Sequence, residues 1–536
     1  MRSLKDFDSG EQARVGWMGN LHKKPNDRGS YFDTEQLAVG LKGRALRGAG
    51  ATVFSQMSIF GIQMIGTIVL ARLLTPSDFG LLAMVTAFSF LFQNFGLRGF
   101  TEATIQSDTL DHDKTSTLFW IQVALSVGTT LLFIGLAPLM AWFYGDGRLV
   151  GIAVVIGLSF IFNALSTQHL ALLQRNMHFY RVAGNEVIAT ILTQVVSIAF
   201  AIWGWGYWAL VARRVTPFVA MAGGAWVLCR WVPGLPRRRT GIGPLMKFGM
   251  NTYGNFATNY FSRNLDKVLL GWRYGAQVLG HYERAYYLFV MPVNQLTNPL
   301  TAVAVAALSR LRDDSEKFRA YYLKGVSVLA LIGMPLSAIL TLSGKDLLLF
   351  LLGSQWREAG EVFSIFGPAI GITLIYATHG WLHLALGRAD RWFRWGIIEL
   401  MACSLCFVIG LRFGAIGVAS AYTLSFFILI GPGLWYAGKP IGITFSTVMS
   451  ITWKYSLAAL FAGVLTWIIL YGVEPTGHIF ANLHHLLKIL VSGTLCLLLY
   501  IGFGVVFFGD VRWISGFLSL LREMLGNIRT GGSAEG

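Results

Sequence analysis

A stripe of polar side chains along one apolar segment is the strongest chemical signal in this sequence. The stripe recurs every four residues, at Asn251, Asn255, Asn259, Arg263 and Lys267. At this spacing the side chains of an α-helix share one face, which drifts by about 40° at each step. Charged groups cost several kcal/mol in hydrocarbon unless they face a cavity or a partner. This face is therefore predicted to contact water or a polar ligand.

Arg213 and Arg214 lie inside the preceding apolar segment, at a depth that matches Arg263. A helix rises 1.5 Å per residue, so counting from the predicted loops places these cations at a similar level. Cations in one wall of a cavity suit an anionic head group such as a pyrophosphate. In the alternative, Asp266 neutralises Arg263 and Lys267 locally. The arginine pair then extends to helix ends or to the interface.

Other polar residues of the apolar segments are candidates for the same cavity. They are Gln63, Gln93, Asn94, Arg98, Asn294, Gln295 and Asn298. Small polar side chains also hold membrane helices together, so the sequence leaves both roles open. Asp266 is the best candidate for ion coupling, because its protonation would respond to ligand binding beside two cations.

Two glutamates and two histidines in the apolar segments are predicted to be structural. Glu186 and Glu399 are placed about one turn inside the ends of their segments, as a structural pair at the interface. His379 and His383 have the spacing of metal ligands, but no third ligand is evident. We predict no metal or cofactor site.

The composition predicts a polytopic membrane protein. Of its 536 residues, 54% are hydrophobic and 13% are charged, whereas soluble chains carry about a quarter charged residues. A cytosolic enzyme, a secreted module and a disordered protein are therefore excluded. The basic residues behind the net charge of +16 lie mainly between apolar spans, so topology explains them and no nucleic-acid partner is predicted.

The predicted fold class is all-α, with about 14 transmembrane helices in two pseudo-symmetric six-helix lobes plus two C-terminal helices. Each span has about 20 apolar residues, enough to cross a ~30 Å hydrocarbon core. The spans are 50–72, 78–98, 117–142, 149–173, 182–203, 207–229, 248–272, 278–308, 322–343, 362–386, 393–411, 415–437, 448–471 and 485–508.

The spans also divide the chain into predicted domains. These are a polar cytosolic tail (1–48), an N-lobe (49–230), a C-lobe (240–438), two further helices (447–509) and an amphipathic cytosolic tail (510–536). Lysines and arginines favour the cytoplasmic side, which places both termini there. The opposite loops are assigned Arg72, Arg148, Arg273, Arg284, Lys345, Arg357, Arg412 and Lys488.

An internal repeat relates the two lobes. LARLLTPSDFG (70–80) aligns with LGWRYGAQVLG (270–280), and further matches follow at offsets of 213 and 210. Six spans per unit give both units the same orientation, as in transporters with parallel repeats. In the aligned repeat, Gln63 is the counterpart of Arg263 and Thr67 is the counterpart of Lys267. One lobe therefore offers uncharged groups where the other offers cations.

At two motifs the sequence resembles the polysaccharide transport (Wzx-type) flippases of the multidrug/oligosaccharidyl-lipid/polysaccharide exporter superfamily. The motifs are LARLLTPSDFG (70–80) and NLDKVLLGWRYGAQVLGHYERAY (264–286), and the resemblance covers about residues 48–440. It implies a bacterial inner-membrane protein with two lobes around a central cavity and alternating access. It also implies export of an undecaprenyl-pyrophosphate-linked oligosaccharide for exopolysaccharide, capsule or O-antigen (lipopolysaccharide) synthesis. The charged extension of 48 residues and Ala306, where a proline is expected, depart from the family pattern.

With this resemblance, Arg263 and Lys267, helped by Arg213 or Arg214, are predicted to hold the pyrophosphate. Two rivals remain: a drug antiporter of the same superfamily, which needs unpaired acids in its cavity, and a membrane glycan polymerase or ligase. Short outward loops and the lack of P-loop, HExxH or GxSxG motifs predict that the chain is not an enzyme. The charged tail also permits a scaffold role beside the polysaccharide polymerase and chain-length machinery.

Overall fold

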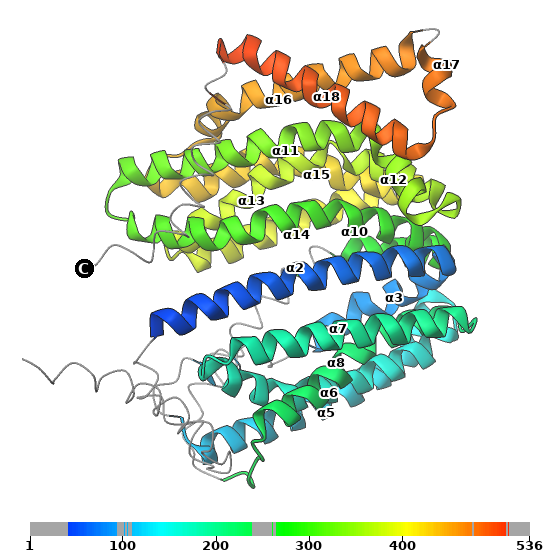
Figure 1. Ribbon diagram of the computed structural model, residues 1–536, viewed down its shortest axis with the longest axis vertical. Coiled ribbons are helices and arrows are strands. Elements are labelled where there is room, and N and C mark those ends of the chain that lie inside the picture. The colour runs from blue at the N-terminus through cyan, green and yellow to red at the C-terminus, as the bar shows by residue number, and fades with distance from the viewer. Residues whose placement is uncertain are drawn as a thin grey trace, which may run out of the picture.

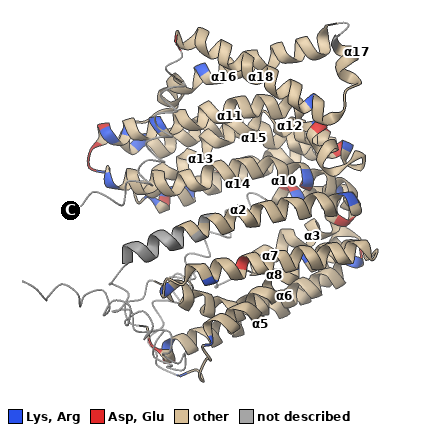
Figure 2. Cartoon of the chain, in the orientation of Figure 1, with Lys and Arg blue, Asp and Glu red and all other residues tan. Residues whose placement is uncertain are grey.

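The computed structural model describes residues 41–93, 101, 104–105, 110–237, 260, 264–473, 476–510 and 513. Every regular element within these ranges is helical, and long helices cross the molecule side by side (Figure 1). Lys, Arg, Asp and Glu gather at the two ends of the helices, with few between (Figure 2). The predicted all-α membrane fold is confirmed.

Six helices of the described residues form the first bundle, which we call the N-lobe. They are α2 (Leu41–Leu73), α3 (Pro76–Gln93), α5 (His112–Tyr144), α6 (Arg148–Arg175), α7 (Phe179–Ile202) and α8 (Tyr207–Cys229). Helix α2 begins inside the segment 1–48 that was predicted to be a tail. Its main neighbour is α7, and Figure 1 shows it on the side of the N-lobe that faces the second bundle.

The second bundle, the C-lobe, is followed by two helices that pack on its outer side. Its helices are α10 (Leu265–Arg310), α11 (Ser315–Leu352), α12 (Arg357–Phe366), α13 (Ala369–Ala385), α14 (Ala389–Gly410) and α15 (Gly414–Gly438). Helices α16 (Phe445–Trp467) and α18 (His485–Phe508) contact α11, and the short α17 (Thr476–Ala481) lies between them in sequence. Figure 1 places α16 and α18 farthest from the N-lobe.

Helix α10 is folded into two arms at a single glycine. Gly275 has φ 79° and ψ −174°, a conformation that only glycine adopts readily. Residues 265–274 and 276–310 therefore lie against each other, which sets Asp266 opposite Tyr282 and Lys267 opposite Glu283. The first arm ends, and the second begins, at the same end of the molecule as the turn between α2 and α3.

We call this end of the molecule the seam end, because the two lobes touch there, and the opposite end the far end. The contact between α3 and α10 leaves no room for side chains at two glycines. A Cβ on Gly80 would lie 1.7 Å from the carbonyl oxygen of Ala276, and one on Gly280 would lie 1.8 Å from that of Pro76. Backbone therefore packs on backbone across the seam.

A second contact between the lobes, the α2–α11 contact, lies beside this seam. The Trp356 indole N–H and the Gln355 carboxamide both donate to the carbonyl oxygen of Ala71, at 2.8 and 2.6 Å. In the opposite direction, Arg72 donates to the carbonyl oxygens of Phe350 and Leu351 at the end of α11. These carbonyls lack partners within their own helices, so the two lobes satisfy each other's helix ends.

Fewer spans are evident in the structure than were predicted from the sequence. Eight described helical stretches are long and apolar enough to cross a membrane, or nine if the bent pair Ser354–Phe366 and Ala369–Ala385 forms one span. One of the eight, Ala389–Ile441, contains both α14 and α15. The count of fourteen stays a prediction, and segment 248–263 (apart from Tyr260) and the amphipathic tail (apart from Asp510 and Trp513) lie outside the described residues.

Candidate functional site

Partly buried cations from both lobes meet near the seam, and we call this group the cation cluster. It consists of Arg213 and Arg214 of α8 with Lys267 and Arg284 of α10. Each lies about 10 to 14 Å from the turn at the seam end of its helix, at 1.5 Å per residue from Gly206 or Gly275. Arg213, Arg214 and Lys267 were among the binding residues predicted from the sequence, whereas Arg284 was not.

Arg213 is held by the N-lobe helix α2. Its Nη2 atom donates to the Thr67 hydroxyl at 2.7 Å and to the Gln63 carbonyl oxygen at 3.4 Å. Both acceptors are uncharged, so they orient the guanidinium group without neutralising it. Gln63 therefore contributes its backbone, whereas its side chain was the predicted contact. Thr67, the repeat counterpart of Lys267, takes the direct role.

Arg214 points to a different part of the N-lobe. Its Nη2 atom donates to the Gln93 side-chain oxygen at 3.2 Å, and its guanidinium carbon lies 5.9 Å from the ring centroid of Phe90. Tyr260 stacks on that same ring, with centroids 5.3 Å apart, and is near enough to feel the charges of Arg214 and Lys267. Tyr260 thus lies close to both cations, Arg214 and Lys267.

Lys267 has an acid partner that sequence analysis missed. Its Nζ atom lies 2.9 Å from Glu283 Oε2 and 4.5 Å from the ring centroid of Tyr286. The two charged side chains are only 13% and 19% exposed. The alternative in which Asp266 neutralises Lys267 left out Glu283, which the fold of α10 at Gly275 brings to Lys267. Arg263, the other cation of that alternative, lies outside the described residues.

Asp266 is completely buried beside this pair. Its Oδ2 atom accepts a hydrogen bond of 2.5 Å from the Tyr282 hydroxyl, and its Oδ1 atom has no hydrogen-bond partner within the described ranges. A carboxylate without water contact does not exchange ions directly with solvent. The observed geometry ties the two arms of α10 together, and an ion-coupling role for Asp266 stays a prediction.

Arg284 does not lie where it was predicted, which was in a loop on the side opposite the cytoplasm. It lies nine residues into the second arm of α10, with its guanidinium carbon 4.5 Å from the ring centroid of Phe79 in α3 and 5.1 Å from that of Tyr287. It is also close enough to Arg213 for their charges to repel. The sequence motif GHYERAY (280–286) could have predicted this position, because it places Glu283 and Arg284 inside the predicted span 278–308.

The cluster has more positive than negative charge. Within the described ranges, Lys267 is paired with Glu283, whereas the three arginines of the cluster form no salt bridge. Uncompensated cations at this depth cost free energy, which is recovered when an anion binds. The arrangement can therefore hold a multiply charged anion between α8 and α10.

Several predicted site residues lie elsewhere. Asn294 lines a separate polar cavity in the C-lobe rather than the cation cluster. Gln93, by contrast, contacts the cluster directly through Arg214. Six predicted residues lie outside the described residues, namely Asn94, Arg98, Asn251, Asn255, Asn259 and Arg263.

Glu399 also departs from its predicted place. It lies ten residues into α14, about 15 Å from the helix start, and lines the C-lobe cavity together with His379. Glu399 therefore lies farther from the start of its helix than the predicted single turn, and its structural, interfacial role stays a prediction. Glu186 agrees better with prediction, because it accepts a hydrogen bond from Gln56 where α7 packs on α2.

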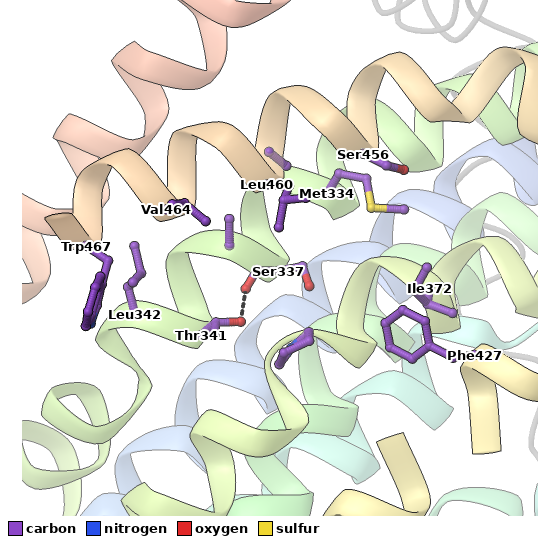
Figure 3. A pocket seen from close by; sticks show the side chains of 14 residues that line it. Met334, Ser337, Thr341, Leu342, Ile372, Phe427, Ser456, Leu460, Val464 and Trp467 are labelled. Atoms are coloured by element: carbon purple, nitrogen blue, oxygen red, sulfur yellow. Dashed lines mark hydrogen bonds between the residues drawn. The ribbon is translucent and has the colours of Figure 1, made fainter. Parts of the chain in front are cut away.

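An apolar groove of about 440 Å³ lies between α11, α15 and α16 (Figure 3). Its walls include Leu460, Val464 and Phe427, and its two hydroxyl groups from α11 are turned to the backbone. Ser337 donates to the Gly367 carbonyl oxygen and Thr341 to the Ser337 carbonyl oxygen, each at 2.6 Å. The groove therefore offers hydrocarbon but no charge, and it cannot be the anion site.

Taken together, the long apolar helices in two bundles define a multi-pass membrane protein with a cluster of partly buried cations between the bundles. The family model described as "Polysaccharide biosynthesis protein" matches residues 69–361, more than half of the chain. The chain belongs to this family, and the resemblance to Wzx-type polysaccharide exporters is confirmed.

Curated relatives cover most of the chain. It is 24% identical to the lipopolysaccharide biosynthesis protein WzxC of Escherichia coli (strain K12), over 74% of this chain and 83% of WzxC. It is 25% identical to the teichuronic acid biosynthesis protein TuaB of Bacillus subtilis (strain 168), over 84% of this chain and 94% of TuaB.

Among solved structures, the fold is similar to that of the lipid II flippase MurJ in an inward closed conformation. The TM-score is 0.68 at 15% sequence identity, over 87% of this chain and 99% of MurJ. At this identity the similarity establishes the fold alone.

Proposed function

We propose that this protein is a flippase that moves an undecaprenyl-pyrophosphate-linked oligosaccharide from the cytoplasmic to the periplasmic leaflet of a bacterial inner membrane. The observation that supports this most directly is the set of three partly buried arginines that form no salt bridge within the described residues. The relatives WzxC and TuaB are named for polysaccharide biosynthesis, and MurJ is named a flippase of a lipid-linked substrate.

In this proposal Arg213, Arg214 and Arg284 bind the pyrophosphate oxygens, and Lys267 is released from Glu283 as the anion enters. Planar guanidinium groups suit phosphate because they donate two parallel hydrogen bonds. Arg263 and the carboxamides of Asn255 and Asn259 come before Lys267 in the same segment and extend the site. Arg98 would add a cation from the N-lobe, and Asp266 would couple transport to an ion.

The seam explains how one side of the membrane is closed. Apart from the four-member cation cluster, the seam end has few basic residues, and the far end has more, including those of segments 230–237 and 310–324. The positive-inside rule supports a cytoplasmic far end, and in this proposal both termini lie on that side. With the seam shut on the periplasmic side, the substrate enters from the cytoplasm. Rocking of one lobe against the other then opens the seam.

The charge of the cluster also separates this proposal from its rivals. A drug antiporter for cations needs acids in its cavity, whereas here the two acids are engaged by Lys267 and Tyr282. A polymerase or ligase needs a catalytic group beside a water-exposed acceptor site. We therefore propose transport without covalent chemistry, and no cofactor.

The proposal is tested by binding of undecaprenyl pyrophosphate and of uncharged undecaprenol to the protein in nanodiscs. Arg284→Gln and Arg213→Gln each remove a charged donor worth about 1.5–3 kcal/mol, so the affinity for undecaprenyl pyrophosphate falls roughly 10- to 150-fold. Binding of undecaprenol is unchanged. In cells, the same variants accumulate lipid-linked glycan on the cytoplasmic leaflet while inserting normally into the membrane.

Arg273→Gln is the matched control, because Arg273 lies in the same helix but is exposed at the seam end. It leaves the affinity unchanged. Equal losses for Arg273→Gln and Arg284→Gln, or export at the normal rate in Arg284→Gln cells, would contradict the assignment of the pyrophosphate site.

A further inference from the structure

A polar cavity lies among the helices of the C-lobe, beside the cation cluster. Its volume is about 270 Å³, and its walls come from α10, α13, α14 and α15. A water molecule takes roughly 30 Å³, so the cavity has room for about nine waters or one sugar ring. Aromatic rings, carboxamides and one carboxylate line it, among them Trp392, Tyr422, Asn294, Asn298 and Glu399.

These groups have the chemistry of a carbohydrate site. Sugar hydroxyls both donate and accept hydrogen bonds, and carboxamides and carboxylates supply the matching partners. The C–H face of a sugar ring is apolar and packs on the negative face of an aromatic ring. Within the described residues, the carboxamides of Asn294 and Asn298 form no side-chain hydrogen bond, so they are available to a ligand.

The Glu399 carboxylate is oriented by a chain of hydrogen bonds behind it. The Tyr376 hydroxyl donates to Glu399 Oε2 at 3.2 Å, and the Trp395 indole N–H donates to the same hydroxyl at 2.8 Å. A carboxylate fixed in this way accepts hydrogen bonds from hydroxyl or amide groups. It also repels another carboxylate, which discriminates against acidic sugars.

One residue joins this cavity to the cation cluster. Tyr286 lines the cavity, and its ring centroid lies 4.5 Å from Lys267 Nζ. Asn294 follows eight residues later in the same helix, about 12 Å further on. A ligand whose phosphates contact Lys267 therefore places its next group against Tyr286, one of the residues that line the cavity.

We propose that the C-lobe cavity binds the sugar attached directly to the pyrophosphate and selects an uncharged pyranose over a uronic acid. This inference rests on the proposed function, because the phosphate contact at Lys267 sets the position of the sugar. It adds a specificity site, in which Trp392 and Asn294 contact the ring and Glu399 excludes acidic substituents.

The test compares four lipids in nanodiscs: undecaprenyl pyrophosphate alone, and the same lipid with N-acetylglucosamine, glucose or glucuronic acid. The wild-type protein binds at least one of the two uncharged glycolipids more tightly than it binds the bare lipid. It binds the glucuronic acid lipid no more tightly than the bare lipid. Trp392→Ala and Asn294→Ala each weaken the favoured glycolipid about tenfold and leave the bare lipid unchanged. Glu399→Gln reduces the discrimination against glucuronic acid.

Trp435→Ala is the matched control, since Trp435 is 51% exposed on α15 and does not line the cavity. Equal affinity of the wild-type protein for bare and sugar-bearing lipids would overturn the sugar site. The site would also be refuted if Trp392→Ala weakened binding of the bare lipid equally or changed the binding of neither lipid. Failure of the proposed function gives a different pattern, because Arg284→Gln then leaves all four affinities unchanged.

Discussion

Closure of the seam depends on Gly280, and Gly280→Ala should force the two lobes apart. The new Cβ would lie 1.8 Å from the carbonyl oxygen of Pro76, whereas non-bonded atoms need about 3.5 Å. The helices must therefore separate by roughly 1.7 Å, because a backbone carbonyl cannot rotate aside as a side chain does. Overpacking of this kind costs about 1–3 kcal/mol, which shifts the equilibrium away from the closed seam about 5- to 150-fold.

Double electron–electron resonance measures this shift between spin labels at Trp203→Cys and Arg412→Cys, in a background without the native cysteines. Both sites are exposed at the seam end, in different lobes. Gly280→Ala should increase the population with the longer distance. Gly61→Ala in α2 is the control, since its Cβ meets nothing within 4 Å. If the two variants give the same distance distribution, the seam does not limit opening.

Two further substitutions test the contacts around the cation cluster. Thr67→Val removes the 2.7 Å hydrogen bond to Arg213 and should weaken undecaprenyl pyrophosphate binding about 5- to 10-fold, whereas Ser58→Ala, which loses only a bond within α2, should not. An equal loss in both variants would argue against a role for Thr67. Tyr282→Phe leaves buried Asp266 without its donor and should lower the thermal unfolding midpoint in detergent, with partial recovery in the double variant that adds Asp266→Asn. Exposed Tyr321→Phe is the control, and no recovery in the double variant would contradict the coupling.

The fold and most of the cation cluster were predictable because burial of charge in hydrocarbon is rare and leaves a clear trace in sequence. Arg213, Arg214 and Lys267 stand out as charges inside apolar segments. The similar depth predicted from helix rise concerned Arg213, Arg214 and Arg263, and Arg263 lies outside the described residues. The internal repeat was found by aligning the two halves of the sequence, and its paired residues Glu186 and Glu399 lie in α7 and α14, the fifth spans of their lobes.

The partners of these charges were not predictable, because they depend on where the chain reverses. The count of loop charges assigned Arg284 to an outer loop, although it falls within the predicted span 278–308. The positive-φ residue Gly275 lets the second arm of α10 start at once, so Arg284 lies nine residues into that arm. Lys267 then meets Glu283 instead of Asp266. Glu399 was placed too near the surface for a related reason, since α14 begins at Ala389, before its first long apolar run.

The α2–α11 contact has an evolutionary consequence. Its donors are the side chains of Arg72, Gln355 and Trp356, but its acceptors are all main-chain oxygens. Every residue type presents such an oxygen, so positions 71, 350 and 351 can drift without losing the interaction. Mutational constraint therefore falls unequally on the two sides of each bond. Sequence covariation between partners, which reports many helix contacts, will be weak here even though the contact holds two lobes together.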